Sequence, residues 1–355
     1  MTEPEALERT EPPAARRGRA LPTSWPRRLI QPISGLALGL ILLWLTVRGI
    51  HWQAVGASLG QADPVWIGLS LLTVLLTLGA KAARWRDLFP DAAALRRRSV
   101  ARALMVGMLV NAFLPFRLGD VARFHTLGRD EGISQAKVAG TIGAEKGFDT
   151  LFLLLAAALT GALGAMPGGL GRPLAAAAGL GAVLLALAAA LPPRRVAAIA
   201  RRTAGSRLTV WLPEPAVERL TGLVRHAMVG LESLRSPRLA AAACTWSVII
   251  WTLAAGTNLV LFRAFDMALG PSAALLLLIV LHAGTAVPSS PGRVGVFHAL
   301  TILGLRSLPG AGSAGVDPAV ALAYATALHG VVYGPQILLG TLALALRPRA
   351  REAAR

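Results

Sequence analysis

Long apolar runs alternate with short polar stretches along most of this chain. A helix rises 1.5 Å per residue, so it needs about 20 apolar residues to cross a hydrocarbon layer about 30 Å thick. Six runs approach or exceed this length, and the pattern predicts a full membrane span at each of them. These runs are residues 29–47, 64–82, 147–165, 174–191, 240–262 and 319–346.

Two further apolar stretches are interrupted by residues that break helices. Residues 99–116 contain Asn111 and Pro115, and residues 272–306 contain the run Pro288-Ser289-Ser290-Pro291-Gly292. Non-helical backbone at membrane depth is tolerated only where it is buried in protein or lines a water-filled cavity. We therefore predict an all-α polytopic membrane protein with six full spans and two re-entrant broken hairpins, about eight membrane segments in all. Eight full spans are the alternative.

Composition agrees with a membrane protein and argues against the soluble classes. Hydrophobic residues make up 54% of the chain and charged residues 15%, whereas a soluble domain has about 25% charged residues. The net charge is +18, but the cations lie between apolar runs rather than along a soluble face, which argues against nucleic-acid binding. The single cysteine, Cys244, excludes an intrachain disulfide and a cysteine-based zinc site.

The arginines and lysines predict an orientation in the membrane. They concentrate in residues 1–28, 81–102, 117–137, 192–238 and 347–355. Positively charged connections favour the cytoplasmic side. We therefore expect both termini to be cytoplasmic and the protein to lie in a bacterial cytoplasmic (inner) membrane, with a disordered basic tail at 1–28 and a short tail at 347–355.

A short motif occurs at both breaks. Pro115-Phe116-Arg117-Leu118-Gly119 and Pro291-Gly292-Arg293-Val294-Gly295 both read P-x-R-x-G, 176 residues apart, and the same offset carries the span at 64 onto the span at 240. The topology derived from the charges gives the two broken hairpins opposite orientations. We predict two inverted membrane repeats, 29–165 and 166–346, a construction typical of transporters.

The densest polar cluster surrounds the first break. Pro115 ends a helix, and Gly119 permits close backbone approach. Arg117 and Arg123 are suited to hold a phosphate, while Asp120 can pair with one of them. The alternative is an interfacial turn whose arginines reach the lipid headgroups. The candidate binding residues are Asn111, Pro115, Arg117, Gly119, Asp120 and Arg123.

Three ionisable residues, Glu145, Lys146 and Asp149, lie at the start of the next predicted span. Glu145 and Asp149 are four residues apart and therefore share one helix face. Such groups cost about 2.5–3.5 kcal/mol each at the centre of a membrane helix, so they normally face a cavity or pair with a partner. Two interpretations stay open: a direct role in binding substrate, and an ion-pair lock that holds the first hairpin to this helix.

The second break offers hydroxyl and backbone groups as donors to an anionic headgroup. A helix that starts after Gly292 would point its positive dipole end at the ligand, beside Arg293; the alternative is a simple loop. His282, His298 and His329 lack the close spacing of a zinc site, so we predict no bound metal. The candidate binding residues are Pro288, Ser289, Ser290, Pro291, Gly292, Arg293, Gly295, His298 and His329.

These motifs carry a family resemblance. The run N-x-x-x-P-x-R-x-G-D-x-x-R from Asn111 to Arg123, with Glu145 and Asp149 and the Pro-x-x-Pro-Gly-x-x-Gly run at 288–295, resembles the lysylphosphatidylglycerol synthase transmembrane family of flippase-like membrane proteins. The resemblance extends from about residue 30 to 346. Fused members carry a soluble aminoacyl-transferase domain that makes aminoacylated phosphatidylglycerol, and their membrane part moves that lipid between leaflets. We expect this chain to lack that domain.

Three residues depart from the family pattern. Lys146 stands where arginine is usual, Arg293 where a second glycine is usual, and His298 where glutamate is common. The second and third changes alter the charge of the expected cavity. We therefore do not carry the headgroup preference of the family over to this chain.

Together these features predict a lipid translocator that binds an anionic or phosphate-bearing headgroup in a polar intramembrane cavity, with membrane phospholipids as its partners. The chain contains no P-loop, GxSxG or HExxH motif, so we expect no cofactor and leave enzymatic activity open. The alternatives are an enzyme that acts on a lipid-linked substrate and a non-transporting partner of a lipid-modifying membrane enzyme.

Overall fold

The computed structural model describes residues 47–114, 117–162, 236–284, 291–306 and 316–346, with a few positions between 37 and 45. Every regular element in these ranges is a helix, which confirms the all-helical class for them. Several sequence predictions lie outside the described residues. They concern the tails 1–28 and 347–355, most of the span at 29–47, the span at 174–191, most of the connection 192–238, Pro115 and Pro288–Ser290.

Long helices alternate with shorter ones along the described part of the chain. In chain order the helices are α2 (Trp52–Gln61), α3 (Pro64–Asp87), α4 (Arg97–Phe113), α5 (Leu118–Glu131), α6 (Gln135–Ala162), α10 (Pro237–Ala264), α11 (Pro271–Gly284), α12 (Val296–Arg306) and α13 (Pro318–Ala345), with short 3₁₀ turns η1 (Ala92–Ala94) and η4 (Pro291–Arg293).

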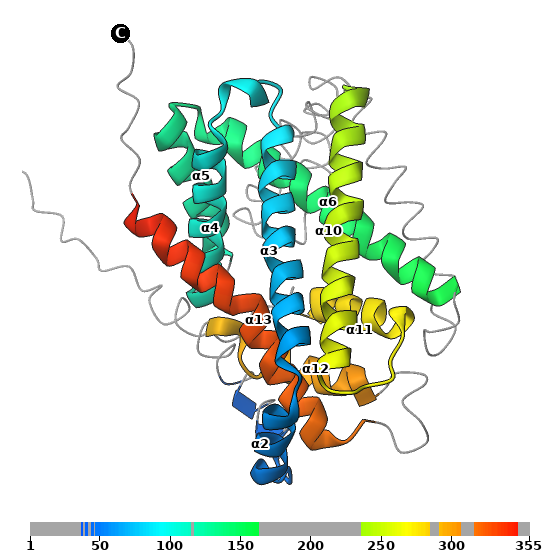
Figure 1. Ribbon diagram of the computed structural model, residues 1–355. Coiled ribbons are helices and arrows are strands. Elements are labelled where there is room, and N and C mark those ends of the chain that lie inside the picture. The colour runs from blue at the N-terminus through cyan, green and yellow to red at the C-terminus, as the bar shows by residue number, and fades with distance from the viewer. Residues whose placement is uncertain are drawn as a thin grey trace, which may run out of the picture.

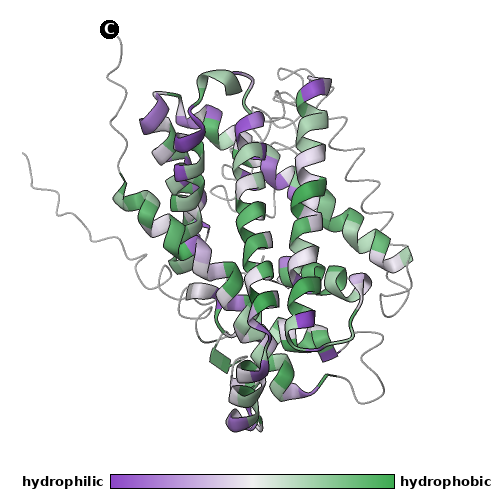
Figure 2. Ribbon diagram, viewed as in Figure 1, coloured by the Kyte–Doolittle hydropathy of each residue, from purple (hydrophilic) through white to green (hydrophobic). Residues whose placement is uncertain are grey.

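Three of the described helices, α3, α10 and α13, are long and apolar enough to cross a membrane. They coincide with the predicted spans at 64–82, 240–262 and 319–346. Only 22–28% of the residues in their apolar windows are buried, so most of their side chains are at least partly exposed, as in helices that contact lipid. Figure 2 shows hydrophobic residues along the middle of α3 and α10 and hydrophilic residues near their upper ends.

Two of the long helices begin in the same way. The carboxylate of Asp63 accepts a hydrogen bond from the Val65 amide at 2.8 Å, and that of Asp317 accepts one from the Ala319 amide at 2.7 Å. A proline follows each aspartate as the first helical residue. Proline suits this position because its missing amide hydrogen would have no partner within the helix. These caps explain why α3 and α13 begin at the predicted places.

Two helices extend beyond the predicted spans, which changes the surroundings of charged residues. α3 continues to Asp87, so Lys81 and Arg84, which the charge pattern assigned to a cytoplasmic connection, lie on a helix. α6 begins at Gln135, well before the predicted start at 147, so Glu145 lies inside the helix rather than at its entrance. The predicted limits followed the first charges. A charge ends an apolar run but does not end a helix, because arginine, lysine and glutamate are good helix formers.

Both breaks separate paired helices. We define the first hairpin as α4 and α5, and the second hairpin as α11, η4 and α12. In the first, Arg96 before α4 forms an ion pair with Glu131 at the end of α5 at 2.8 Å. In the second, Gly284 at the end of α11 lies against Leu300 near the start of α12. Figure 1 shows the first hairpin in the upper half of the molecule and the second hairpin in the lower half.

The long helices connect the two hairpins. α3 and α10 lie side by side, and α13 contacts both α12 of the second hairpin and α4 of the first (Figure 1). Near the end of α13, Gly340 lies against the Met105 carbonyl and Leu109 of α4. One buried apolar cluster surrounds the second hairpin, α10 and α13, and another joins α3, α4 and α13. The first and second hairpins are therefore packed against one common helix.

Candidate functional site

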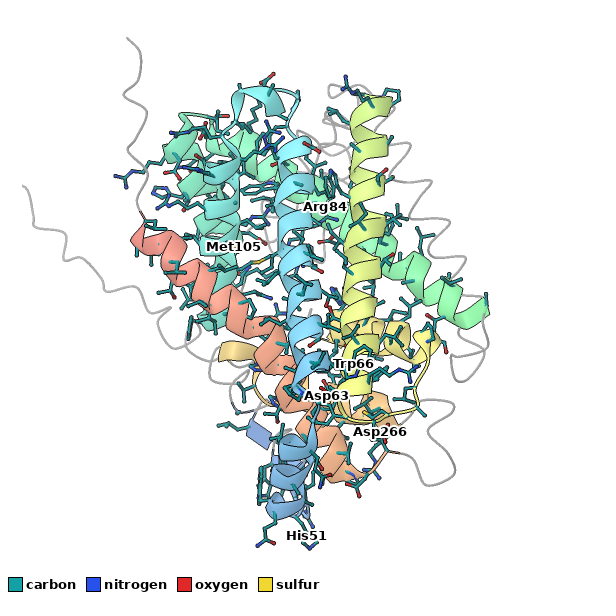
Figure 3. All side chains as sticks on the ribbon, in the orientation of Figure 1. His51, Asp63, Trp66, Arg84, Met105 and Asp266 are labelled. Atoms are coloured by element: carbon teal, nitrogen blue, oxygen red, sulfur yellow. The ribbon has the colours of Figure 1, made fainter. Side chains whose placement is uncertain are left out.

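A fully buried arginine on α3 joins three helices. Arg84 has no exposed surface. Its Nη2 donates to Oδ1 of Asp149 on α6 at 2.7 Å, and its Nη1 donates to Oγ of Ser247 on α10 at 3.0 Å. Figure 3 shows Arg84 on the side of α3 that faces α10. Because an unpaired buried guanidinium is strongly unfavourable, these partners determine how α3, α6 and α10 fit together.

Arg84 was not among the residues singled out from the sequence. Its position in the helical register was the available indication. Lys81, Arg84 and Trp85 are three and four residues apart, so they share one face of α3. The predicted span ended at its first charged residue, so Arg84 was assigned to a loop and this shared face was not recognised.

A second buried arginine connects the first hairpin to α6. Nη2 of Arg123 on α5 lies 2.5 Å from Oε2 of Glu145, and Nη1 lies 3.3 Å from Oε1. The guanidinium also lies 4.0 Å from the centre of the Trp85 ring, and that indole donates to the Thr141 hydroxyl at 3.1 Å. The ion pair corresponds to the lock that was one interpretation of Glu145.

The remaining charged residues lie beside these two pairs. Asp120 has one oxygen 3.7 Å from Arg123 and the other 3.8 Å from the half-exposed Lys146. Glu145 also lies 3.8 Å from Arg84. The ion pairs form one group, which we call the buried charge cluster. It consists of Arg84, Asp120, Arg123, Glu145, Lys146 and Asp149.

At the first break, the two helices approach through glycine. The Gly119 amide donates to Oδ1 of Asn111 at 2.8 Å. A methyl group at Gly119 would collide with the Gly107 carbonyl and the Asn111 side chain, so only glycine fits between these segments. Arg117 is exposed and adopts a left-handed backbone with φ of 54° immediately before α5.

The second break has a similar backbone. Arg293 also has φ of 54°, and Gly292 and Gly295 on either side have φ of 69° and 93°. The Gly292 carbonyl lies 2.8 Å from Nε2 of His329 on α13. A left-handed backbone is uncommon for residues other than glycine, and the two P-x-R-x-G motifs share it at their arginine. They differ at the final glycine, because Gly119 lies inside α5 and Gly295 precedes α12 with a positive φ.

Aromatic rings surround the second break. His329 lies 4.6 Å from Tyr333, 5.2 Å from His298 and 5.3 Å from Phe297, measured between ring centres. His298 is buried, and its Nδ1 has no hydrogen-bond partner among the described residues. Arg293 lies close to the Tyr333 hydroxyl. A polar ligand at this place would contact the unpaired Nδ1 of His298 and the guanidinium of Arg293.

The structure thus brings the candidate residues together in two groups. The first is the buried charge cluster, and the second is formed by Gly292, Arg293, His298 and His329. Arg117 forms no ion pair within the described ranges. In the same ranges, no three histidine, cysteine, aspartate or glutamate side chains are arranged to hold a metal ion.

Residues 33–340 match the family described as the lysylphosphatidylglycerol synthase TM region. The chain belongs to this family. The family resemblance drawn from the two breaks and the acidic pair is confirmed. The match includes both hairpins and every long helix of the described part except the last residues of α13.

Two named proteins are similar to this member of the lysylphosphatidylglycerol synthase TM family. A UPF0104 membrane protein of Methanothermobacter thermautotrophicus is 25% identical over 308 residues, which cover 81% of this chain and 87% of that protein. Glycosyltransferase AglD of Haloferax volcanii is 23% identical over 335 residues, which cover 86% of this chain and 52% of AglD. The chain therefore spans about half the length of AglD. No solved structure matches the chain.

Proposed function

We propose that this protein binds the phosphate-bearing headgroup of a membrane lipid between its two hairpins and moves the lipid between leaflets. The observation that carries this proposal is the matched geometry of the breaks. Arg117 and Arg293 both have a left-handed backbone. Arg117 directly precedes α5, and Arg293 lies three residues before the first residue of α12. The first amides of such a helix lack partners within it and favour an anion. At the first break the amides of Gly119 and Asp120 already have acceptors. What the two breaks share is therefore an arginine near the start of a helix, where the helix dipole favours an anion.

We propose that the two halves are inverted repeats with six full spans and two re-entrant hairpins. The offset of 176 residues relates the P-x-R-x-G motifs and carries the start of α3 close to the start of α10. Hairpins in opposite halves of the molecule support this arrangement (Figure 1). In inverted-repeat transporters, broken helices meet at a binding site near the middle of the membrane.

We propose that both termini lie on the cytoplasmic side of a bacterial cytoplasmic membrane, because arginine-rich segments favour that side. The ion pairs assign different roles to the candidate residues. Because Arg123 is held by Glu145, we assign it to positioning the first hairpin. We assign direct contact with the phosphate to Arg117, which is exposed, and to Arg293, which is half-buried.

Leaflet exchange in proteoliposomes tests the proposal. Wild-type protein should exchange a fluorescent phospholipid, whereas Arg117→Ala and Arg293→Ala should each slow the exchange about tenfold, because a charge-assisted contact to the phosphate is lost. Arg129→Ala is the matched control, since Arg129 is an exposed cation on the last turn of α5. Exchange that both site variants leave at the wild-type rate would contradict the proposal.

A second candidate function is the modification of a lipid-linked substrate, and the name of AglD favours it. A carboxylate that acts on a substrate must be free to contact it. Glu145 and Asp149 are instead engaged by arginines in this structure. Incubation of the purified protein with a lipid-linked acceptor and nucleotide sugars, followed by mass spectrometry, separates this candidate from the translocator.

A further inference from the structure

The face of α3 that carries Arg84 also carries Lys81, three residues earlier. Lys81 is half-buried and lies six residues before the end of α3. Its side chain interacts electrostatically with Arg84 and Lys146 and with the carboxylates of Glu145 and Asp149. Lys81 therefore borders the buried charge cluster, although nothing in the sequence pattern separated it from the loop cations.

With Lys81 included, cations outnumber carboxylates in this region. Each of the three carboxylates lies within 4 Å of Arg84, Arg123 or Lys146. Lys81 forms no ion pair at that distance with any residue that the structure describes. The surplus positive charge lies within a helix long and apolar enough to cross the membrane, where an uncompensated charge is unfavourable. The region therefore favours binding of an anion.

Two buried nitrogen atoms also favour the binding of an anion. Nε of Arg84 and Nε of Arg123 are buried, and neither has a hydrogen-bond partner among the described residues. The other guanidinium nitrogens bond carboxylates of the cluster, except that Nη1 of Arg84 bonds the Ser247 hydroxyl. Oδ1 of Asp120 in the cluster is also buried without a hydrogen-bond partner among the described residues. Within the described part of the chain, the cluster therefore has two unused donors and one unused acceptor.

Lys81 also lies toward the second hairpin. His282 on α11 interacts electrostatically with Lys81, Asp149 and Arg293. Its Nδ1 lies 3.1 Å from the Leu278 carbonyl of the same helix, which orients the ring. Lys81 from α3 and Arg293 from the second break therefore both lie within electrostatic range of one imidazole, and neither has an ion pair in the described ranges.

We propose that Lys81 binds the phosphodiester of the lipid headgroup, together with Arg293, between α3 and the second hairpin. This inference rests on the proposed function and adds a binding residue on α3 to it. A lysine ammonium binds phosphate as a compact point charge with three donors. The alternative is a lysine that extends along the helix to the membrane surface, and such a residue would not affect ligand affinity.

Binding is measured by the melting temperature of the full-length protein in neutral detergent with added phosphatidylglycerol. Uncharged diacylglycerol, which has the same acyl chains and no phosphate, is the control lipid. Lys81→Gln should require about tenfold more phosphatidylglycerol than wild type for the same shift, whereas Lys81→Arg should respond like wild type. Lys137→Gln is the matched control, because Lys137 pairs with the exposed Asp91 outside the cluster.

Inorganic phosphate tests whether the phosphate group that Lys81 binds belongs to a lipid headgroup or to a free phosphate ion. A stabilisation by inorganic phosphate that Lys81→Gln lacks would overturn the assignment to a lipid headgroup. Stabilisation by phosphatidylglycerol alone supports it. Equal responses of wild type and Lys81→Gln to phosphatidylglycerol would overturn the role of Lys81. If Lys81→Gln does not fold in the absence of lipid, Lys81→Met serves in the same comparison.

Leaflet exchange separates this inference from the proposed function. If Arg117→Ala abolishes exchange while Lys81→Gln exchanges and binds lipid like wild type, the inference fails and the translocator remains. If wild type exchanges no lipid but Lys81→Gln weakens phosphatidylglycerol binding, translocation fails and the binding residue remains.

Discussion

The two hairpins are held in place by different forces. Charged side chains anchor the first hairpin to its neighbours. Arg123 pairs with Glu145 of α6, and Arg102 of α4 lies 2.6 Å from Asp130 at the end of α5. Arg102 also donates to the Ala343 carbonyl near the end of α13 at 2.9 Å. The first hairpin is therefore fixed at both ends by guanidinium groups.

The second hairpin is packed mainly through apolar and aromatic side chains. Leu277 of α11 and Leu305 of α12 have no exposed surface, and both belong to a buried cluster with Tyr324 and Leu328 of α13. Gly284 and Gly304 let the two helices of this hairpin approach each other's side chains. The stability of the second hairpin therefore depends on how well its apolar side chains fill the space between the helices.

This difference bears on how the hairpins respond to a ligand. An ion pair is directional, and an anion near it competes for the same cation. Apolar packing depends on buried area and density and is insensitive to ligand charge. We therefore expect charge changes to act on the first hairpin and volume changes to act on the second.

The largest expected effect is on the first hairpin. Glu145→Ala leaves Arg123 buried without its main partner, and we expect the free energy of unfolding to fall by about 3–5 kcal/mol. Equilibrium unfolding of the purified protein in detergent measures the loss. The double variant Arg123→Met/Glu145→Leu removes both charges and should recover most of the stability. A loss below about 1 kcal/mol for Glu145→Ala would mean that water or lipid reaches Arg123.

The next effect concerns the second hairpin. Leu277→Ala removes a fully buried side chain and leaves a cavity, so we expect a loss of about 3 kcal/mol in the same unfolding measurement. Leu277→Met nearly conserves volume and should cost less than about 1.5 kcal/mol. If Leu277→Ala is as mild as Leu277→Met, the second hairpin is less tightly packed than the buried areas indicate.

A smaller effect is expected where the helices of the first hairpin meet. Gly119→Ala forces a methyl group against the Gly107 carbonyl and should cost about 1–3 kcal/mol of unfolding free energy. Gly79→Ala on α3 is the control, because nothing lies within 4 Å of a methyl group there. We expect Gly79→Ala to be neutral or slightly stabilising. Similar results for the two variants would show that the first break can open without cost.

The smallest effect tests a polar contact within the apolar packing of the second region. The Tyr324 hydroxyl donates to Oδ1 of Asn258 at 3.2 Å, and Nδ2 of Asn258 donates to the Ala274 carbonyl at 3.1 Å. Tyr324→Phe keeps the ring and should cost about 1 kcal/mol. A cost as large as that of Leu277→Ala would show that hydrogen bonding also holds the second hairpin.

The breaks were predictable from the sequence because their causes are local. Proline ends a helix wherever it stands in the interior, and glycine permits a positive φ. The first predicted break falls between the end of α4 at Phe113 and the start of α5 at Leu118, and the second falls between α11 and α12, where Gly292 and Gly295 have a positive φ. The caps at Asp63 and Asp317 are local as well, since each aspartate bonds amides two or three residues away.

The roles of the charged residues were only partly predictable. The spacing of Glu145 and Asp149 predicted one shared face, and both bond arginines. The partner of Asp149 did not follow from spacing, because Arg84 lies 65 residues before it.

The sequence alone determined that this protein is a helical membrane protein of the lysylphosphatidylglycerol synthase TM family, with two broken apolar stretches and an acidic pair on one helix face. Hydrophobic length, proline and glycine act over a few residues, so they can be read along the chain. Tertiary structure alone decided that Arg84 and Arg123 are buried and paired, and that Lys81 lies beside them without an ion pair in the described ranges. A charge is stable at membrane depth only when distant segments bring it a partner, and only the folded chain shows which segments meet.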